Sequence, residues 1–285
     1  MILLADSGST KSHWCLLSRS GHSREVFTSG MNPYQMSVAE LGKVVSEELL
    51  PCLAADWWAG TITDVYFYGA GCTPQKVRDV ESALSVCFKH ANFHIESDMV
   101  GAAIALFGAS EGIACILGTG SNSCHWSGQK ICSQVPALGY ILGDEGSGAV
   151  LGRALVADIL KNQTDKALKE KFLTQYNTSE AEIIERVYRQ PLPNRYLAGF
   201  AKFAKENIEH PDVHRLVYQH FNTFVCRVLK QYDEGLPIGF VGSVAYHFSD
   251  ILESVLRDNG MSARTVVQSP MEGLIDYHKK ILAEN

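Results

Sequence analysis

The chain has 285 residues, 46% of them hydrophobic and 20% charged, and its 25 Lys and Arg against 31 Asp and Glu leave a formal net charge of −6. This length is typical of two globular domains, and the mild acidity without a basic cluster disfavours a nucleic-acid partner. No apolar stretch approaches the ~20 residues of a membrane helix, and the first residues lack the basic region of a signal peptide, so we expect a cytoplasmic protein without a membrane partner.

A nine-residue segment near the N-terminus recurs later in the chain. Asp6–Trp14 (DSGSTKSHW) aligns without a gap on Gly118–Trp126 (GTGSNSCHW), at an offset of 118 − 6 = 112 residues. An apolar run precedes each copy, so each copy predicts a strand, a tight turn of small residues and a second strand. Third strands are expected at Glu25–Ser29 and Lys130–Val135.

Helices and strands alternate after the first of these hairpins. Ser37 and Glu40 form a capping-box pattern ahead of an apolar helical stripe that continues to Leu49. Further elements are predicted as a strand at Ile62–Tyr68, a helix from Thr73 to about Ala91 and a strand at Phe93–Ser97. The first half therefore begins with a βββαβα unit, which is typical of a sheet covered by crossover helices.

The second half repeats this scheme with helices inserted. Helices are predicted at Gly148–Leu160, Asp165–Gln175, Ser179–Arg189, Asn194–Ile208 and Asp212–Tyr232. The chain then predicts a strand at Ile238–Val241, a helix through Leu256, a strand at Thr265–Gln268 and a helix at Pro270–Leu282. We therefore expect one domain of residues 1–110, joined by the C-terminal helix at about 270–285, and a second domain of residues 111–269.

The turns Gly8-Ser9-Thr10 and Gly118-Thr119-Gly120 are candidates for binding polyphosphate. Small residues let backbone N–H groups and hydroxyls approach an anion closely. Either turn alone is explained as well by an ordinary hairpin, but two related turns that begin two domains favour phosphate binding. The chain contains neither a Walker P-loop nor a G-x-G-x-x-G fingerprint after a strand, which disfavours a P-loop NTPase and a Rossmann dehydrogenase.

Four segments, taken in chain order, resemble the motifs of a known family. They are Ala5–Ser12 (ADSGSTKS), Leu117–Asn122 (LGTGSN), Leu142–Ser147 (LGDEGS) and Gly239–Ala245 (GFVGSVA). These segments resemble the N-acetylglucosamine kinase and BadF/BadG-type ATPase family of the actin, sugar kinase and Hsp70 superfamily. The resemblance implies an α/β fold of two ribonuclease-H-like (actin-like ATPase) domains on a duplicated βββαβα core, with a helical insertion in the second domain and ATP in the cleft between them.

The resemblance also implies which residues hold ATP and its metal ion. Asp6 is expected to orient Mg²⁺ through water, because Mg²⁺ keeps several waters and takes few carboxylates. A turn-forming aspartate is the alternative for this residue. The residues expected to bind ATP are Gly8, Ser9, Thr10, Lys11, Gly118, Thr119, Gly120, Gly242 and Ser243.

Asp98 is the expected catalytic base. It follows the strand Phe93–Ser97, at the edge of a sheet where clefts form. From position alone it could simply be the N-cap of the next helix, and the two roles are compatible. The resemblance implies that its carboxylate accepts the proton of a sugar 6-hydroxyl during phosphoryl transfer.

The residues implied to bind the sugar are Asn32, Asp98, Ser121, Asn122, Gly139 and Asp144. In the segment Gly143-Asp144-Glu145-Gly146-Ser147, we expect Asp144 to contact sugar hydroxyls and Glu145 to be structural or to support the residues that contact the sugar. The chain departs from the Trp-Gly segment of related sugar kinases, because Leu138 stands before Gly139 and the nearest aromatic residue is Tyr140. This departure leaves the sugar and its acetylation open.

The function implied is an ATP- and Mg²⁺-dependent kinase that phosphorylates the 6-hydroxyl of an amino sugar, with N-acetylglucosamine as the first choice. The alternative is a BadF/BadG-type ATPase that activates a partner enzyme and holds an iron–sulfur cluster with clustered cysteines. The eight cysteines of this chain include no C-x-x-C pair, so we expect them to be structural thiols. The oligomeric state stays open, with a homodimer among the options.

Overall fold

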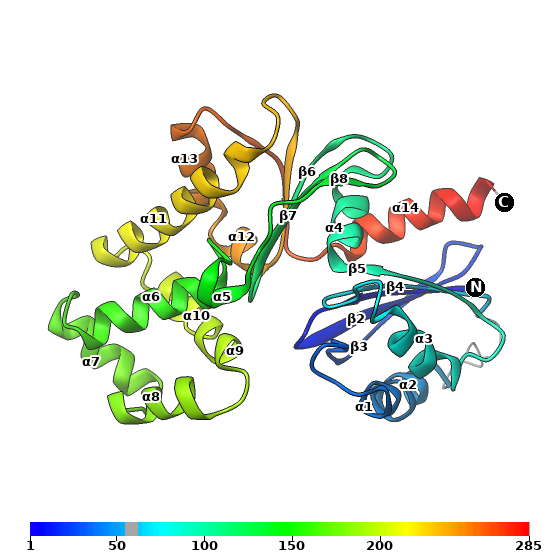
Figure 1. The fold of residues 1–285 in the computed structure, drawn as a ribbon, viewed down its shortest axis with the longest axis horizontal. Coiled ribbons are helices and arrows are strands. Elements are labelled where there is room, and N and C mark those ends of the chain that lie inside the picture. The colour runs from blue at the N-terminus through cyan, green and yellow to red at the C-terminus, as the bar shows by residue number, and fades with distance from the viewer. Residues whose placement is uncertain (55–61, 285) are drawn as a thin grey trace. The chain divides into compact units, whose positions relative to one another are not determined.

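The computed structural model describes residues 1–54 and 62–284. The chain forms two compact units, each with its own five-stranded sheet (Figure 1). The N-terminal unit comprises Met1–Ser110, Gly128–Lys130 and the chain from Pro270, and the C-terminal unit comprises Glu111–Ser127 and Ile131–Ser269. None of the helices in the described ranges is both long enough and apolar enough to cross a membrane.

The first sheet places three strand ends side by side. Its strands are β1 (Ile2–Ser7), β2 (Lys11–Leu17), β3 (Ser23–Ser29), β4 (Asp64–Gly69) and β5 (Asn92–Ser97), in the order β3-β2-β1-β4-β5. β1, β4 and β5 are parallel, with Ser7 beside Gly69 and Gly69 beside Ser97. The residues that follow these three strands therefore meet at one edge of the sheet.

The second sheet repeats this topology. Its strands are β6 (Gly112–Leu117), β7 (Ser121–Trp126), β8 (Ile131–Ser133), β9 (Ile238–Val241) and β10 (Ala263–Val267), in the order β10-β9-β6-β7-β8. β6 pairs antiparallel with β7 and parallel with β9, as β1 does with β2 and β4. The duplicated core and the α/β class predicted from the sequence are confirmed.

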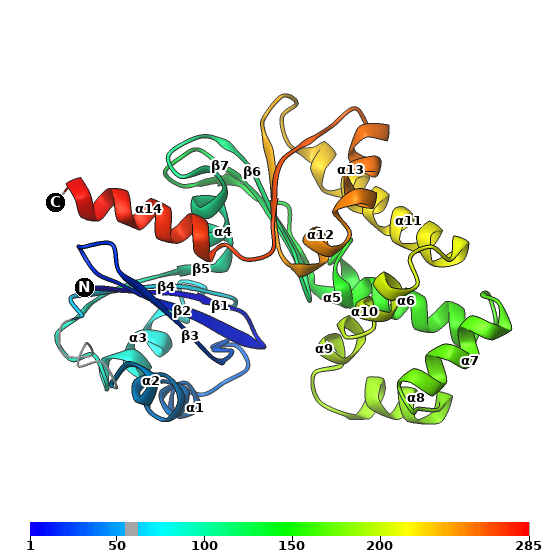
Figure 2. The same ribbon diagram turned by 180° about the vertical axis from the view of Figure 1, so that it is seen from behind.

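Helices cover both faces of the first sheet (Figures 1 and 2). One face packs against α1 (Val38–Lys43), the π-helical segment Val44–Leu49, α2 (Leu50–Ala54) and α3 (Val77–Ser85). The other face carries α4 (Asp98–Phe107) and the last helix, α14 (Met271–Glu284). The predicted capping box is present, since Ser37 and Glu40 bond reciprocally at the start of α1. The prediction of a helix from Thr73 to about Ala91 was too long, because turns occupy both flanks of α3.

The C-terminal unit contains the helical insertion. Its helices are α5 (Gly139–Leu142), α6 (Gly148–Leu160), α7 (Lys166–Gln175), α8 (Glu180–Arg189), α9 (Pro193–Ala198), α10 (Ala201–Glu206), α11 (Pro211–Arg227), α12 (Ser243–His247) and α13 (Ser249–Asp258). The prediction of one helix over Asn194–Ile208 was wrong, because the helix breaks at Gly199, a poor helix former. The predicted helix after β9 is likewise two helices, separated at Phe248.

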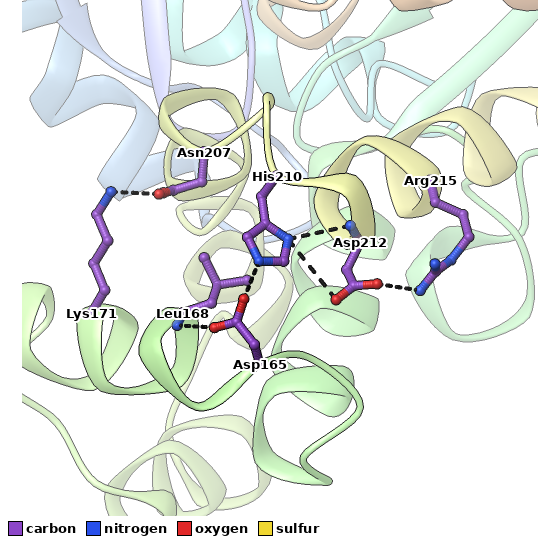
Figure 3. A network of polar contacts seen from close by, with 7 residues as sticks. All are labelled: Asp165, Leu168, Lys171, Asn207, His210, Asp212 and Arg215. Carbon is purple, nitrogen blue, oxygen red and sulfur yellow. Dashed lines mark hydrogen bonds and ion pairs between the residues drawn. The ribbon is translucent and has the colours of Figure 1, made fainter.

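A single histidine joins the starts of α7 and α11 (Figure 3). Asp165 caps α7, because its Oδ1 accepts a hydrogen bond of 2.8 Å from the N–H of Leu168. His210 caps α11, because its Nδ1 accepts a hydrogen bond from the N–H of Asp212 at 3.3 Å. Since Nδ1 accepts, Nε2 carries the proton of the neutral ring and donates a hydrogen bond of 2.5 Å to Oδ2 of Asp165.

Candidate functional site

Two carboxylates lie together at the strand-end edge of the first sheet. Asp6 precedes the last residue of β1, and Asp98 begins α4 directly after β5. Burial, together with the negative charge of Asp98, raises the pKa of Asp6 to about 7. Burial also raises the pKa of Asp98, against the opposing effect of hydrogen bonds from backbone N–H groups. The pair is a recessed site of mutually repelling carboxylates, which a divalent cation would stabilise.

Asp98 does not cap the helix that it begins. The N-cap is Ser97, whose Oγ accepts a hydrogen bond of 3.4 Å from the N–H of Val100. The capping role considered for Asp98 is therefore wrong. Its carboxylate accepts from the N–H groups of Met99 and of Asp98 itself, at the start of the helix.

The first glycine turn packs against Gly30, and it leaves space beside Gly8. It closes through a 3.0 Å hydrogen bond from the N–H of Gly8 to the carbonyl of Lys11. Gly30 backs the turn so closely that a Cβ at residue 30 would lie 2.4 Å from the carbonyl oxygen of Gly8. A Cβ on Gly8 would meet only the Lys11 carbonyl, at 3.5 Å, among the described residues. The turn therefore keeps a fixed shape and leaves Gly8 accessible.

Asn32 connects this turn to the loop that follows β4. It is 7% exposed, and its Nδ2 donates a 2.7 Å hydrogen bond to Oγ of Ser9. Its Oδ1 accepts from the N–H of Tyr34 at 2.9 Å. Gly71 approaches the same oxygen, since a Cβ at residue 71 would lie 2.3 Å from it. The residue expected to bind sugar thus lies beside the turn expected to bind phosphate.

Lys11 has a partner on the neighbouring strand. Its Nζ lies 3.6 Å from the ring centroid of Phe27, which is 53% exposed. The same ring stacks on the imidazole of His13, with centroids 4.2 Å apart. The ammonium group expected to bind ATP is therefore held over an aromatic ring by a cation–π contact.

The second glycine turn is bonded to the start of α6. The N–H groups of Gly148 and Ala149 donate to the carbonyls of Gly118 at 2.8 Å and Thr119 at 3.0 Å. Apart from its two chain neighbours, no described residue lies within 4 Å of the position that a Cβ on Gly118 would occupy. On the other side, Gly242 has φ +124°, and a Cβ there would lie 2.3 Å from the carbonyl oxygen of Leu117. The second turn and the Gly242-Ser243 pair therefore meet at the ends of β6 and β9.

Asp144 lies across the second turn. A Cβ on Gly120 would be 3.0 Å from Oδ2 of Asp144, and the N–H of Ser121 donates to this carboxylate. The backbone of Asp144 is left-handed, with φ 53°, and its N–H donates a 2.9 Å hydrogen bond to the carbonyl of Ala137. Burial and the charge of Glu145 raise the pKa of Asp144 to about 6. Three residues of the expected site thus come together within the C-terminal unit.

No family model matches the chain, and no curated protein sequence matches it. Among solved structures, a proposed N-acetylglucosamine kinase from Porphyromonas gingivalis shares 48% sequence identity and a TM-score of 0.95, over 98% of this chain and 99% of that one. The chain belongs to the N-acetylglucosamine kinase and BadF/BadG-type ATPase family. It is an ATP-dependent sugar kinase of this family.

More distant structures share the fold of this kinase. A proposed N-acetylglucosamine kinase from Chromobacterium violaceum has 20% identity and a TM-score of 0.74, over 97% of this chain and 98% of that one. Component A of (R)-2-hydroxyglutaryl-CoA dehydratase from Acidaminococcus fermentans has 12% identity and a TM-score of 0.51, over 99% and 98% of the two chains. At these identities the likeness shows the fold alone.

The segment that departs from the family pattern is a compact loop in this kinase. Leu138 and Gly139 have φ values of 63° and 73°, and the N–H of Gly143 donates to the carbonyl of Gly139 at 2.7 Å. Arg153 holds the loop through a 2.7 Å hydrogen bond from Nη1 to the carbonyl of Tyr140. The loop exposes three apolar side chains by 64–70%, those of Leu138, Ile141 and Leu142. Gly139 therefore lies at the base of an apolar surface that precedes Asp144.

Asn122 and Glu145 are engaged within the kinase. Oδ1 of Asn122 accepts hydrogen bonds from the N–H of Ser123 at 2.9 Å and from Nε2 of Gln134 at 2.8 Å. Glu145, whose side chain is 13% exposed, forms a 2.8 Å ion pair through Oε1 with Nη1 of Arg227. This pairing agrees with the structural role expected for Glu145.

Two residues of the site were missed by sequence reasoning. Cys72 is buried in the loop after β4, and burial, with the charge of Asp98, raises the pKa of its thiol to about 12. Its place after a parallel strand next to β5 could have suggested this proximity. Arg227 ends α11, far along the chain from Glu145, and no motif in the sequence indicates this pairing.

Proposed function

We propose that this kinase transfers the γ-phosphoryl group of ATP to the 6-hydroxyl of N-acetylglucosamine in the cytoplasm, with Asp98 as general base. The observation that carries the proposal is the pair formed by Asp6 and Asp98 beside the Gly8–Thr10 turn, in a chain 48% identical to a proposed N-acetylglucosamine kinase. The pair supplies both a metal-binding carboxylate and a proton acceptor.

Asp98 has the properties that a general base requires. Burial raises its pKa above the ordinary aspartate value, which makes its ionised carboxylate a stronger proton acceptor. In the transfer, the 6-hydroxyl loses its proton to Asp98 as its oxygen bonds to the γ-phosphorus. The bond from phosphorus to the bridging oxygen breaks at the same time, and ADP leaves with that electron pair.

Asp6 fits a magnesium ion. Burial and, to a lesser extent, the charge of Asp98 raise its pKa, and a cation beside it would stabilise the ionised carboxylate. Bound Mg²⁺ supplies charge neutralisation to the phosphates of ATP. The role of Asp6 is to hold the ion, through water, at the strand-end edge.

The two turns are proposed to hold the phosphates of ATP. Gly8 and Gly118 have space where a Cβ would be, which allows an anion to approach the backbone. The hydroxyls of Ser9, Thr10 and Thr119 are hydrogen-bond donors at the turns, and Lys11 adds a positive charge. Gly120 completes the second turn, and Gly242 with Ser243 would lie against adenosine.

The residues proposed to bind the sugar are Asn32, Asp98, Ser121, Asn122, Gly139 and Asp144. Asp144 is suited to accept hydrogen bonds from sugar hydroxyls, because its carboxylate is held by the N–H of Ser121 at the turn. The apolar side chains of Leu138 and its neighbours favour a sugar with an apolar substituent, such as an acetyl group.

A substrate panel tests the proposal. The purified protein is incubated with ATP and Mg²⁺ and, in turn, N-acetylglucosamine, N-acetylmannosamine, glucosamine and glucose, and the products are identified by NMR. We expect N-acetylglucosamine 6-phosphate and stoichiometric ADP, and no phosphorylated product from 6-deoxy-N-acetylglucosamine. A better turnover of another sugar would overturn the substrate assignment. ADP release without any sugar phosphate, with iron in anaerobically purified protein, would support the ATPase alternative instead.

A further inference from the structure

The C-terminal end of α11 packs against the segment that carries Asp144. Gly146 has φ +74°, and a Cβ there would lie 3.3 Å from Cβ of Phe224 and 3.4 Å from Cδ1 of Phe221. Arg227 lies three residues beyond Phe224, on the same side of the helix, and pairs with Glu145 at 2.8 Å. Three successive contacts from one helix face therefore hold Glu145 and Gly146 in place.

The ion pair neutralises a carboxylate that is adjacent to Asp144. The side chain of Glu145 is 13% exposed, so its charge is only partly screened by water, whereas that of Arg227 is 65% exposed. Glu145 is the charged neighbour that raises the pKa of Asp144. Removing Arg227 would leave Glu145 without this counter-charge, beside the carboxylate proposed to bind the sugar.

The backbone of this segment makes the position of Asp144 depend on such support. Asp144 has a left-handed φ of 53° although it carries a Cβ. This backbone conformation costs energy and persists only where the surrounding structure holds it. Its N–H is fixed to Ala137, and the carbonyl of Asp144 accepts a 3.0 Å hydrogen bond from the N–H of Ser147. Between these two hydrogen bonds, the ion pair with Arg227 connects the side chain of Glu145 to α11.

We propose that Arg227 is a positioning residue for sugar binding, which acts by holding Glu145 away from Asp144. The inference rests on the proposed role of Asp144 as a sugar ligand. Arg227 touches neither the sugar nor ATP in this role. Its loss therefore weakens sugar binding and leaves the transfer step nearly unchanged.

The test compares Arg227→Met with Arg227→Lys, on the best sugar substrate of the wild-type enzyme. For Arg227→Met we expect the KM for the sugar to rise about tenfold, with kcat and the KM for ATP changed less than about threefold. Arg227→Lys keeps the positive charge and should restore the KM for the sugar to within about threefold of wild type. A loss of folding alone would lower the amount of active enzyme without raising this KM.

The matched control is Arg215→Met, at the other end of α11. Arg215 also forms an ion pair with a carboxylate, from Nη2 to Oδ1 of Asp212 at 2.7 Å (Figure 3). This variant removes the same charge from the same helix, far along it from Glu145, and should leave both KM values unchanged.

An unchanged KM for the sugar in Arg227→Met would overturn the inference and leave the proposed function standing. The same conclusion would follow if the KM for the sugar rose equally in Arg227→Met and Arg215→Met. A selective tenfold rise on a sugar other than N-acetylglucosamine would support the inference and overturn the substrate assignment. The two failures are therefore distinguishable.

Discussion

The carboxylate of Asp98 lies near enough to that of Asp6 for its charge to help raise the pKa of Asp6 to about 7. The two carboxylates of this acidic site are proposed to have different roles. Asp6 holds the metal ion, and Asp98 accepts the proton. The two carboxylates are close because β1 and β5 end at the same edge of the sheet, and their burial and repulsion disfavour the ionised pair. Their substitution should therefore affect activity and stability in opposite directions.

For Asp98→Asn we expect kcat to fall at least about 100-fold, because asparagine cannot accept the proton of the hydroxyl. The KM for ATP should stay within about threefold of wild type. Thermal unfolding should show the variant at least as stable as wild type, because asparagine removes a buried charge. Turnover near the wild-type rate would contradict the base assignment.

The variant Gly118→Ala tests whether ATP phosphates contact the second turn, because it should change ATP binding without changing stability. No described residue lies within 4 Å of the added methyl group, so the free energy of unfolding should change by less than about 1 kcal/mol. If phosphates approach the backbone of this turn, the KM for ATP should rise at least about fivefold. Steady-state kinetics and urea unfolding measure the two quantities.

The control for this variant is Gly42→Ala in α1, where the methyl group also has no described neighbour within 4 Å outside the adjoining chain and the backbone of its own helix. It should leave the KM for ATP unchanged and stabilise the protein by about 0.5–1 kcal/mol, because alanine favours a helix. An unchanged KM for ATP in Gly118→Ala would argue against phosphate binding at the second turn.

Sugar binding should weaken at acidic pH. The pKa of Asp144 is raised to about 6, so its carboxylate becomes protonated as the pH falls through this value and accepts hydrogen bonds less well. We expect the KM for the sugar to rise about tenfold between pH 7 and pH 5 in the wild type. Asp144→Asn should have a high KM at both values, and a KM that rises equally in this variant would refute the assignment.

Stability should also fall at acidic pH, through a different residue. His278 in α14 is 1% exposed and forms a 2.9 Å hydrogen bond through Nε2 with the hydroxyl of Tyr68. Burial and the charge of His94 lower its pKa from 6.5 to about 4. Between these values the unfolded chain binds more protons than the native state, so stability is lost as the pH falls from about 6.5 to about 4, by about 3 kcal/mol.

Urea unfolding of the wild type and of His278→Gln, at intervals from pH 4 to pH 7, measures this effect. Glutamine can still bond to Tyr68 but does not titrate, so its stability should depend less on pH over this interval. Tyr66, Tyr68, His94 and Tyr277 are the titratable groups around His278 and stay the same in both proteins. Identical pH dependence in the two proteins would show that His278 is not responsible.

The repeat in the sequence predicts the duplicated topology, and the two sheets share one strand order. The residue-by-residue alignment of the repeat was wrong, because Gly8 directly follows β1 whereas Gly120 directly precedes β7. Helix ends were harder to predict, since their positions depend on tertiary contacts. The predicted helix breaks at Gly199, next to the place where Leu197 packs on α6. The packing is so close that a Cβ on Gly152 of α6 would lie 1.8 Å from the carbonyl oxygen of Leu197.

The candidate site was predictable where its residues follow strands. Asp6 and Asp98 lie at the ends of strands that the apolar pattern already predicts, so their meeting follows from the parallel pairing. The partners that hold the site in place were not predictable, because they come from distant helices. Arg227 and Glu145 are brought together only by the packing of α11.

The helix α14 determines the order in which the protein can fold during synthesis. Ile2, Leu4, Cys15 and Leu17 of the first sheet share their core with Met271 and Ile275. In a nascent chain these strand residues therefore lack their α14 partners until Met271 and Ile275 have been made, whereas nearly all of the C-terminal unit is made before them. The unit whose strands are made first is therefore the one whose core is completed last.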